Sequence, residues 1–135
     1  MMNKDKIVEA WSKVDSQIKE AKGFLSADKI DEALYFIWLA AENLINTLKT
    51  LQNGYYLKEH RAKSEVLKRY FLLKILKQDY SEVFERLSKY RLAAEFHPYT
   101  SVPKDYTKKD VAYYLGEIES LKKEVGKILI KKGIK

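Results

Sequence analysis

The stretch Ala33-Leu-Tyr-Phe-Ile-Trp-Leu-Ala-Ala41 decides the fold class, because it contains no charged side chain. Apolar residues continue after it at helical spacing: Leu44, Ile45, Leu48 and Leu51. This pattern predicts one long helix, which ends at Asn53 and Gly54 because glycine favours the residue after a helix. A helix that is apolar nearly all round lies at the centre of a bundle or in an oligomer interface.

The segments on either side of this helix also show helical spacing. From about Lys4 to Leu25, apolar residues recur at steps of three or four and predict one buried stripe. They are Ile7, Trp11, Val14, Ile18, Ala21 and Leu25. After a connection from Tyr55 to Arg61, a third helix is predicted from its apolar positions. These are Val66, Leu67, Tyr70, Phe71, Leu73 and Ile75.

Two capping boxes predict the starts of two further helices. Asp79-Tyr-Ser-Glu82 precedes a fourth apolar stripe, and Thr107-Lys-Lys-Asp110 precedes a fifth, which Gly133 ends. No β-alternation of useful length appears, and no repeat or linker divides the chain. The sequence therefore predicts an all-α antiparallel bundle of about five helices, in one domain spanning residues 1–135.

The composition excludes several classes of function. The 135 residues include no cysteine, so thiol catalysis, iron–sulfur clusters, cysteine-bound zinc and disulfides are excluded. Two histidines in separate segments give no metal-ligand spacing, so we expect no metal and no cofactor. The sequence begins without the apolar core of a signal peptide, and no run is long enough to cross a bilayer. We therefore expect a cytoplasmic protein without a membrane partner.

The net charge of +7 favours an anionic partner such as RNA, DNA or an acidic protein. Lys58–Lys77 holds seven Lys or Arg against two Glu, and Lys122–Lys135 holds six Lys against one Glu, so each stretch nets +5. These stretches are either solvated helix faces with a basic tail or a phosphate-attracting surface. His60 and Arg61 are interpreted as part of a solvated loop.

The stretch Arg91-Leu-Ala-Ala-Glu-Phe-His97-Pro98-Tyr99 combines a fixed cation, an imidazole and a phenol. Proline disfavours helical geometry in the residue before it, so His97 is predicted to lie at a helix end. On a continuous helix, Arg91 and His97 would point to different faces, whereas a helix that breaks at Pro98 can bring them together. Such a group of side chains suits a phosphodiester.

A helical domain of this size, with an apolar, aromatic-rich second helix and Arg-x5-His-Pro-Tyr at the end of its fourth, resembles the HEPN family of prokaryotic helical domains. The family motif is an arginine followed after four to six residues by a histidine, often with a tyrosine two places further. Arg91, His97 and Tyr99 match this motif. The residue after the arginine is often polar in the family's nucleases, whereas here it is Leu92.

The resemblance implies a homodimer in which the two motifs face one another across a cleft. In active members it implies metal-independent RNA cleavage, in toxin or defence systems, with Arg91 and His97 in the catalytic roles. For small prokaryotic or archaeal members it also implies a separately encoded minimal nucleotidyltransferase as a partner. That partner would silence the protein by adding AMP to the tyrosine, here Tyr99. The other role open to Tyr99 is to bind the substrate.

RNA cleavage without metal needs a base, an acid and positive charge at the phosphate. The unperturbed pKa of histidine, near 6.5, suits both proton transfers, and a two-fold dimer supplies two histidines. Arg91 stays protonated and offers donors that match phosphate oxygens. The alternative is structural: Arg91 pairs with Glu95 at four-residue spacing, while His97 and Tyr99 close the helix end and pack in a dimer interface.

Glu42, Asn43 and Glu95 are the candidate supports of this site. Glu42 and Asn43 lie in an otherwise apolar helix, where polar side chains need partners. They form either a hydrogen-bonded core or interface pair, or a supporting contact to the cleft. Trp11 and Trp38 lie on apolar stripes and are predicted to be core residues rather than base-stacking platforms.

Two classes of function follow from these observations. The first is a metal-independent ribonuclease that acts through Arg91 and His97. The second is a non-catalytic helical module that binds a nucleotide, RNA or a partner protein through the same cleft, and a purely structural oligomer is a third alternative.

Overall fold

The computed structural model describes residues 4–53, 60–96 and 104–134, and this part of the chain forms five α-helices and no strand. The helices are α1 (Lys4–Ser26), α2 (Ile30–Asn53), α3 (His60–Leu72), α4 (Ser81–Phe96) and α5 (Lys108–Lys131). The predicted all-α bundle is confirmed. Within the described residues, none of these helices has the length and apolar character needed to cross a membrane.

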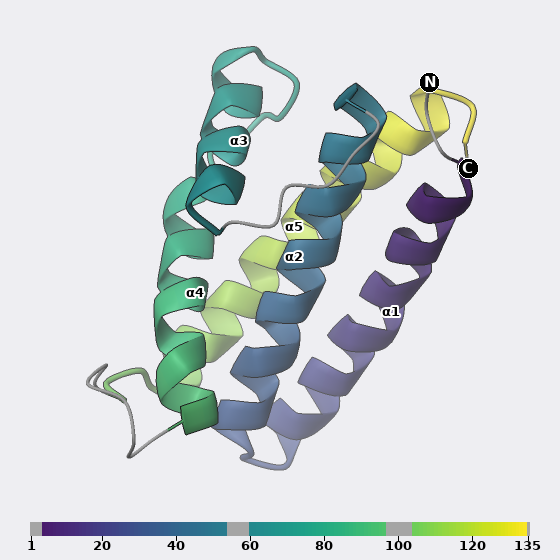
Figure 1. Ribbon diagram of the computed structural model, residues 1–135. Coiled ribbons are helices and arrows are strands. Elements are labelled where there is room, and N and C mark those ends of the chain that lie inside the picture. Colours follow the sequence, from purple (N-terminus) through teal and green to yellow (C-terminus); the bar gives the residue numbers. More distant parts are fainter. Residues whose placement is uncertain (1–3, 54–59, 97–103, 135) are drawn as a thin grey trace.

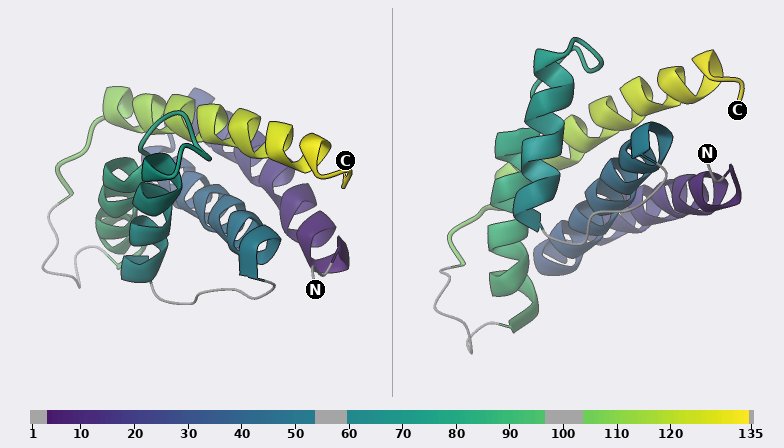
Figure 2. Two further views of the ribbon diagram at one scale, coloured as in Figure 1. Left: turned by 90° about the horizontal axis from the view of Figure 1, so that it is seen from above. Right: turned by 45° about the horizontal axis from the view of Figure 1, so that its top comes forward.

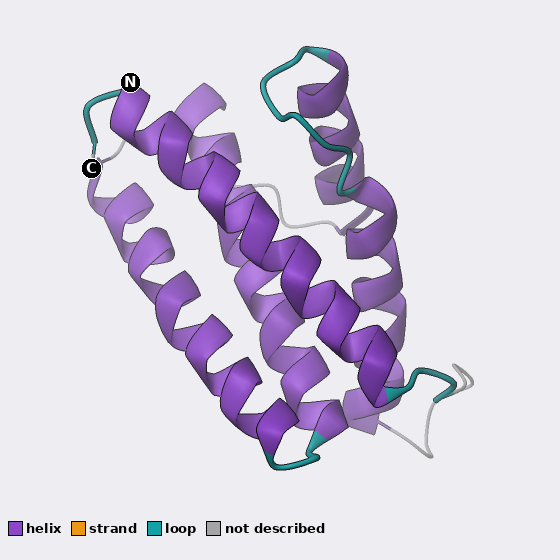
Figure 3. Ribbon diagram, turned by 180° about the vertical axis from the view of Figure 1, so that it is seen from behind, coloured by secondary structure: helices purple, strands orange, loops and turns teal. Residues whose placement is uncertain are grey.

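The second helix, α2, lies at the centre of the bundle, as its apolar sequence predicts. It contacts each of the other four helices. In Figure 1 it lies between α1 and α4, and Figure 3 shows α5 crossing the opposite side of the bundle. The fully buried side chains that α2 supplies include Leu34, Ile37, Leu44, Ile45 and Leu48. Their removal from water is the main force that holds the other helices around α2.

Helices joined by short connections run antiparallel. The α1–α2 and α3–α4 pairs have this arrangement, and α4 in turn runs antiparallel to α2 (Figure 1). The short helix α3 packs on α4 and also contacts α2, on the side of the bundle away from α1 (Figure 2). The antiparallel α2–α4 pair brings the end of α4 beside the first half of α2, which is the arrangement that positions Arg91.

Three helices are followed, two positions after their last residue, by a residue with a left-handed backbone. These residues are Asp28 (φ 60°), Lys74 (φ 63°) and Gly133 (φ 73°). At the end of α3, the Lys74 amide donates to the Phe71 carbonyl (3.0 Å) and the Ile75 amide donates to the Tyr70 carbonyl (2.9 Å). This paired pattern satisfies the last carbonyls of a helix and is usually built on glycine. Gly133 ends α5 as predicted, whereas Lys74 adopts the same geometry with a side chain.

We expect Lys74→Gly to raise the free energy of unfolding by up to about 1 kcal/mol. A left-handed backbone costs a non-glycine residue about 1–2 kcal/mol, and the greater entropy of unfolded glycine offsets part of the gain. Urea unfolding measures the change. Lys74→Ala is the control, because it removes the charge but keeps the Cβ atom, and it should give no increase. An equal increase in both variants would show that charge, not backbone geometry, is responsible.

The start of α4 differs from the prediction by one position. The helix begins at Ser81, and the Asp79 carboxylate accepts a hydrogen bond from the Ser81 amide (2.9 Å). Glu82 accepts from Arg86 (2.7 Å) rather than from the residue before the helix. The predicted box with Asp79 and Glu82 is therefore wrong, although Asp79 does cap a free amide. The box at Thr107–Asp110 is confirmed, with both reciprocal hydrogen bonds present.

The third helix also departs from its prediction at both ends. It begins at His60, so the interpretation of His60 and Arg61 as a loop is wrong. It ends at Leu72, so Leu73 and Ile75 lie beyond it, and Leu73 is exposed. Apolar spacing alone puts this boundary too late, because it gives no sign of the left-handed turn at Lys74 that follows the end of the helix.

Two buried tyrosines in the segments between helices donate hydrogen bonds to carboxylates on other helices. The Tyr80 hydroxyl donates to Glu124 on α5 (2.5 Å), and the Tyr106 hydroxyl donates to Asp31 on α2 (2.6 Å). The Glu124 carboxylate also accepts from the Lys77 amide (2.6 Å). Burial, with a smaller effect of the neighbouring carboxylate, raises the pKa of Tyr80 and of Tyr106 well above the usual value near 10.

We expect these raised pKa values to make the fold sensitive to alkali. Below pH 10 both tyrosines are protonated in the folded and unfolded states, so their contribution is fully present. As the pH rises above about 10, only the unfolded tyrosines release their protons, and the free energy of unfolding falls by up to about 1.4 kcal/mol per pH unit for each. Urea unfolding between pH 9 and 11.5 measures the slope. Tyr106→Phe should make the slope of the free energy of unfolding against pH smaller. An unchanged slope would contradict the raised pKa of Tyr106.

Candidate functional site

Arg91 lies on α4 with its guanidinium over the indole ring of Trp38 on α2. The guanidinium carbon is 4.3 Å from the ring centroid, a cation–π contact. The Trp38 indole nitrogen donates to the Ser88 hydroxyl (3.3 Å), one turn before Arg91 on the same helix, although 50 positions separate Trp38 from Ser88. Because Trp38 is 6% exposed and cannot move freely, it fixes the position of the half-buried Arg91.

One turn further along α2, Glu42 forms an ion pair with Lys63 of α3. The ammonium nitrogen is 2.5 Å from a carboxylate oxygen, and the two side chains are only 18% and 5% exposed. Charges removed from water to this degree are tolerated only when they are paired. The pair therefore fixes α3 against α2 beside the Trp38–Arg91 contact.

Further polar groups extend this interface away from Arg91. The Ser64 hydroxyl donates to Glu85 (3.3 Å), which joins α3 to α4. Lys49, on the second half of α2, is also buried, and burial together with the positive charge of Arg69 lowers its pKa below the usual value. Two charged side chains of α2, Glu42 and Lys49, are thus largely removed from water in an otherwise apolar bundle.

The predicted site residues do not all come together. Glu42 and Arg91 lie on the same side of α2, with Trp38 one turn from Glu42. Asn43 instead donates to Gln17 of α1 (2.9 Å), a hydrogen bond between two helices on another side of α2. His97 and Tyr99 lie outside the described residues, and Glu95 belongs to α4 but its side chain lies outside them too.

Sequence reasoning missed Lys63, Ser88 and Lys49 as parts of this interface. Lys63 belongs to the basic stretch Lys58–Lys77, yet it precedes the apolar positions Val66 and Leu67 at helical spacing and shares their buried face. That spacing is the signal that could have identified it. Lys63 is 4% exposed, so it adds nothing to a phosphate-attracting surface.

Trp38 is a core residue, as predicted, but it also carries the arginine contact. Trp11 is only partly buried and packs at the edge of the core. Tyr70 and Tyr114 are buried within the bundle, which agrees with a packing role for these tyrosines rather than with base stacking.

The arrangement provides a positioned cation next to a helix end. The contact of Arg91 with Trp38 covers one face of the planar guanidinium, while the donors lie around its edge. Because Lys63 engages Glu42, the role open to Glu42 is positional rather than that of a proton acceptor. Among the described residues, no group of three or more His, Asp or Glu side chains has the arrangement needed to hold a metal ion.

Comparison with the models of known protein families gives no match, and no curated protein matches the chain significantly.

Proposed function

We propose that this protein is a HEPN-like, metal-independent endoribonuclease of the toxin or defence type, active as a homodimer. The observation that supports the proposal best is the fixed position of Arg91. Its guanidinium is held over Trp38 in the last turns of α4, and His97 follows the end of that helix directly. A positioned arginine and a histidine at a helix end have the residue types that phosphodiester cleavage needs.

In the proposed mechanism, His97 of one copy takes the proton from the 2′-hydroxyl of the RNA. The 2′-oxygen attacks the phosphorus atom, and the bond from phosphorus to the 5′-oxygen breaks. The second copy's histidine donates a proton to that leaving oxygen, which gives a 2′,3′-cyclic phosphate and a 5′-hydroxyl end. Arg91 stabilises the negative charge that develops on the phosphate oxygens.

Tyr99 lies two positions after His97 and is proposed to contact the substrate phosphate. In the toxin interpretation, Tyr99 is also the residue to which a minimal nucleotidyltransferase partner would add AMP. Either role requires Tyr99 to be near Arg91, since both would act at the same cleft.

The proposal is tested with end-labelled RNA in excess chelator. The wild type should produce cyclic-phosphate ends, and His97→Ala should slow the reaction by about 10²–10⁴-fold. His60→Ala is the matched control, because it removes the other of the chain's two histidines and should leave the rate unchanged. Absence of cleavage by the wild type, or equal rates for His97→Ala and the wild type, would overturn the ribonuclease proposal. RNA binding without cleavage would then favour the non-catalytic module.

A further inference from the structure

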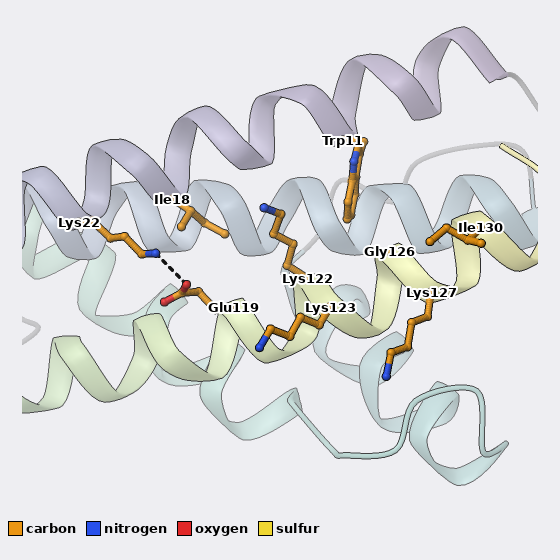
Figure 4. A pocket seen from close by; sticks show the side chains of 9 residues that line it. All are labelled: Trp11, Ile18, Lys22, Glu119, Lys122, Lys123, Gly126, Lys127 and Ile130. Atoms are coloured by element: carbon orange, nitrogen blue, oxygen red, sulfur yellow. Dashed lines mark ion pairs between the residues drawn. The ribbon is translucent and has the colours of Figure 1, made fainter. Parts of the chain in front are cut away.

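A groove of about 400 Å³ lies between α1 and α5 (Figure 4). The Trp38–Arg91 contact instead lies between α2 and α4. Four lysines line it against a single glutamate. These lining residues are Lys22, Lys122, Lys123, Lys127 and Glu119. The apolar part of the lining includes Trp11 of α1 and Ile130 of α5. The lining therefore combines excess positive charge with an aromatic ring.

Trp11 projects from α1 towards Gly126 of α5, as Figure 4 shows. A Cβ atom at position 126 would lie 3.3 Å from the Trp11 ring, which is tighter than most contacts of this kind. Glycine at this position lets the indole lie across the groove between the two helices. Trp11 is only partly buried, so part of its side chain is exposed at the groove.

The four lysines divide into two groups. Lys22 pairs with Glu119 (3.0 Å) and Lys122 pairs with Asp15, so these two join α1 to α5 across the groove. Lys123 and Lys127 are exposed, and their side chains project on the other side of α5 from α1 (Figure 4). Within the described part of the chain, neither forms an ion pair.

Lys123 and Lys127 continue into a longer positive ridge. With exposed Lys131 they are spaced four residues apart, which places the three ammonium groups along about 12 Å of one helix face. A ridge of this length suits a chain of phosphates better than a single phosphate group. It also disfavours a second copy of this protein docked through the same face, because like charges would meet.

We propose that single-stranded RNA binds along the outer face of α5 at the edge of the α1–α5 groove, with phosphates on Lys123, Lys127 and Lys131 and a base entering the groove against Trp11. Single-stranded nucleic acids are bound in this way, by a positive groove and an aromatic platform. The choice of RNA over single-stranded DNA rests on the proposed function. The proposal that this groove binds nucleic acid does not depend on the proposed function, because binding needs no cleavage.

The test is a fluorescence titration of the full chain with a 12-nucleotide 2′-O-methyl RNA, which lacks the 2′-hydroxyl needed for cleavage. Binding should quench the fluorescence of Trp11 but not that of Trp38, because Trp38 is buried. Trp11→Phe should therefore lose the quenching and bind the RNA about fivefold more weakly. Lys123→Gln/Lys127→Gln should weaken binding about tenfold and make the slope of log K against log salt shallower by about 1.4. The titration measures binding alone and needs no cleavage, so its outcome is independent of the nuclease test.

The matched control is Lys13→Gln/Lys109→Gln, which removes the same charge from exposed positions outside the groove lining. It should bind within about twofold of the wild type. Equal weakening by both double variants would overturn the proposal in favour of general charge attraction. A mononucleotide that binds as tightly as the 12-mer, or tighter binding to vesicles that contain phosphatidylserine, would overturn it in favour of a nucleotide or a lipid site.

Discussion

Arg91→Ala is expected to slow RNA cleavage by about 10²–10³-fold, the usual effect of removing one group that stabilises developing charge. In the proposed mechanism, Arg91 is the fixed cation at the phosphate, and its position over Trp38 means that little reorganisation precedes the reaction. Arg91→Lys should retain part of the activity, because it keeps the charge but loses the planar fork of donors. Initial rates with end-labelled RNA in excess chelator measure both effects.

Arg86→Ala is the matched control for this prediction. Arg86 lies on the same helix, but it is exposed and pairs with Glu82 at the first turn. Its removal should leave the rate within about twofold of the wild type. Circular dichroism of Arg91→Ala should show an intact fold. Urea unfolding should show a free energy of unfolding lower by about 0.5–2 kcal/mol, because the cation–π contact is lost. A cleavage rate of Arg91→Ala equal to that of the wild type would show that this arginine has only a structural role.

Glu42→Gln is expected to lower the free energy of unfolding by about 3 kcal/mol, because it leaves the buried Lys63 ammonium without its carboxylate. For a chain of this size the loss corresponds to a fall in Tm of roughly 10 °C. Thermal and urea unfolding measure it. The equivalent change in an exposed pair, Glu82→Gln, should cost less than about 1 kcal/mol, because solvent screens that pair.

The double variant Glu42→Leu/Lys63→Met separates pairing from packing. It removes both charges and keeps apolar volume at the α2–α3 contact, so we expect a stability within about 1 kcal/mol of the wild type. If the double variant is as unstable as Glu42→Gln, the loss comes from altered packing and not from an unpaired charge.

The helices could be predicted from sequence where one apolar stripe dominates. α1, α2 and α5 have such stripes, and their predicted positions agree with the structure. α3 was harder, because Lys63 occupies a position on its buried face. A buried ammonium depends on a carboxylate supplied by another helix, here Glu42. Local patterns contain no information about such a partner.

The candidate site shows the same limit. The end of α4 before Pro98 could be predicted, since a helix-breaking proline acts locally. The position of Arg91 over Trp38 could not be predicted, because it depends on how α4 lies along α2. The α1–α5 groove could not be predicted for a similar reason: its exposed lysines lie on the last helix, but Trp11, which lines the same groove, comes from the first helix.

The central claim, that two copies share one metal-independent site, is tested most directly by measuring solution mass and RNA cleavage together. A dilution series in excess chelator is followed by mass photometry or sedimentation, with initial cleavage rates at each concentration. The account predicts that the rate per chain falls as the mass changes from that of two chains to that of one. Full cleavage by a species with the mass of a single chain, or a stable two-chain species without cleavage, would contradict it.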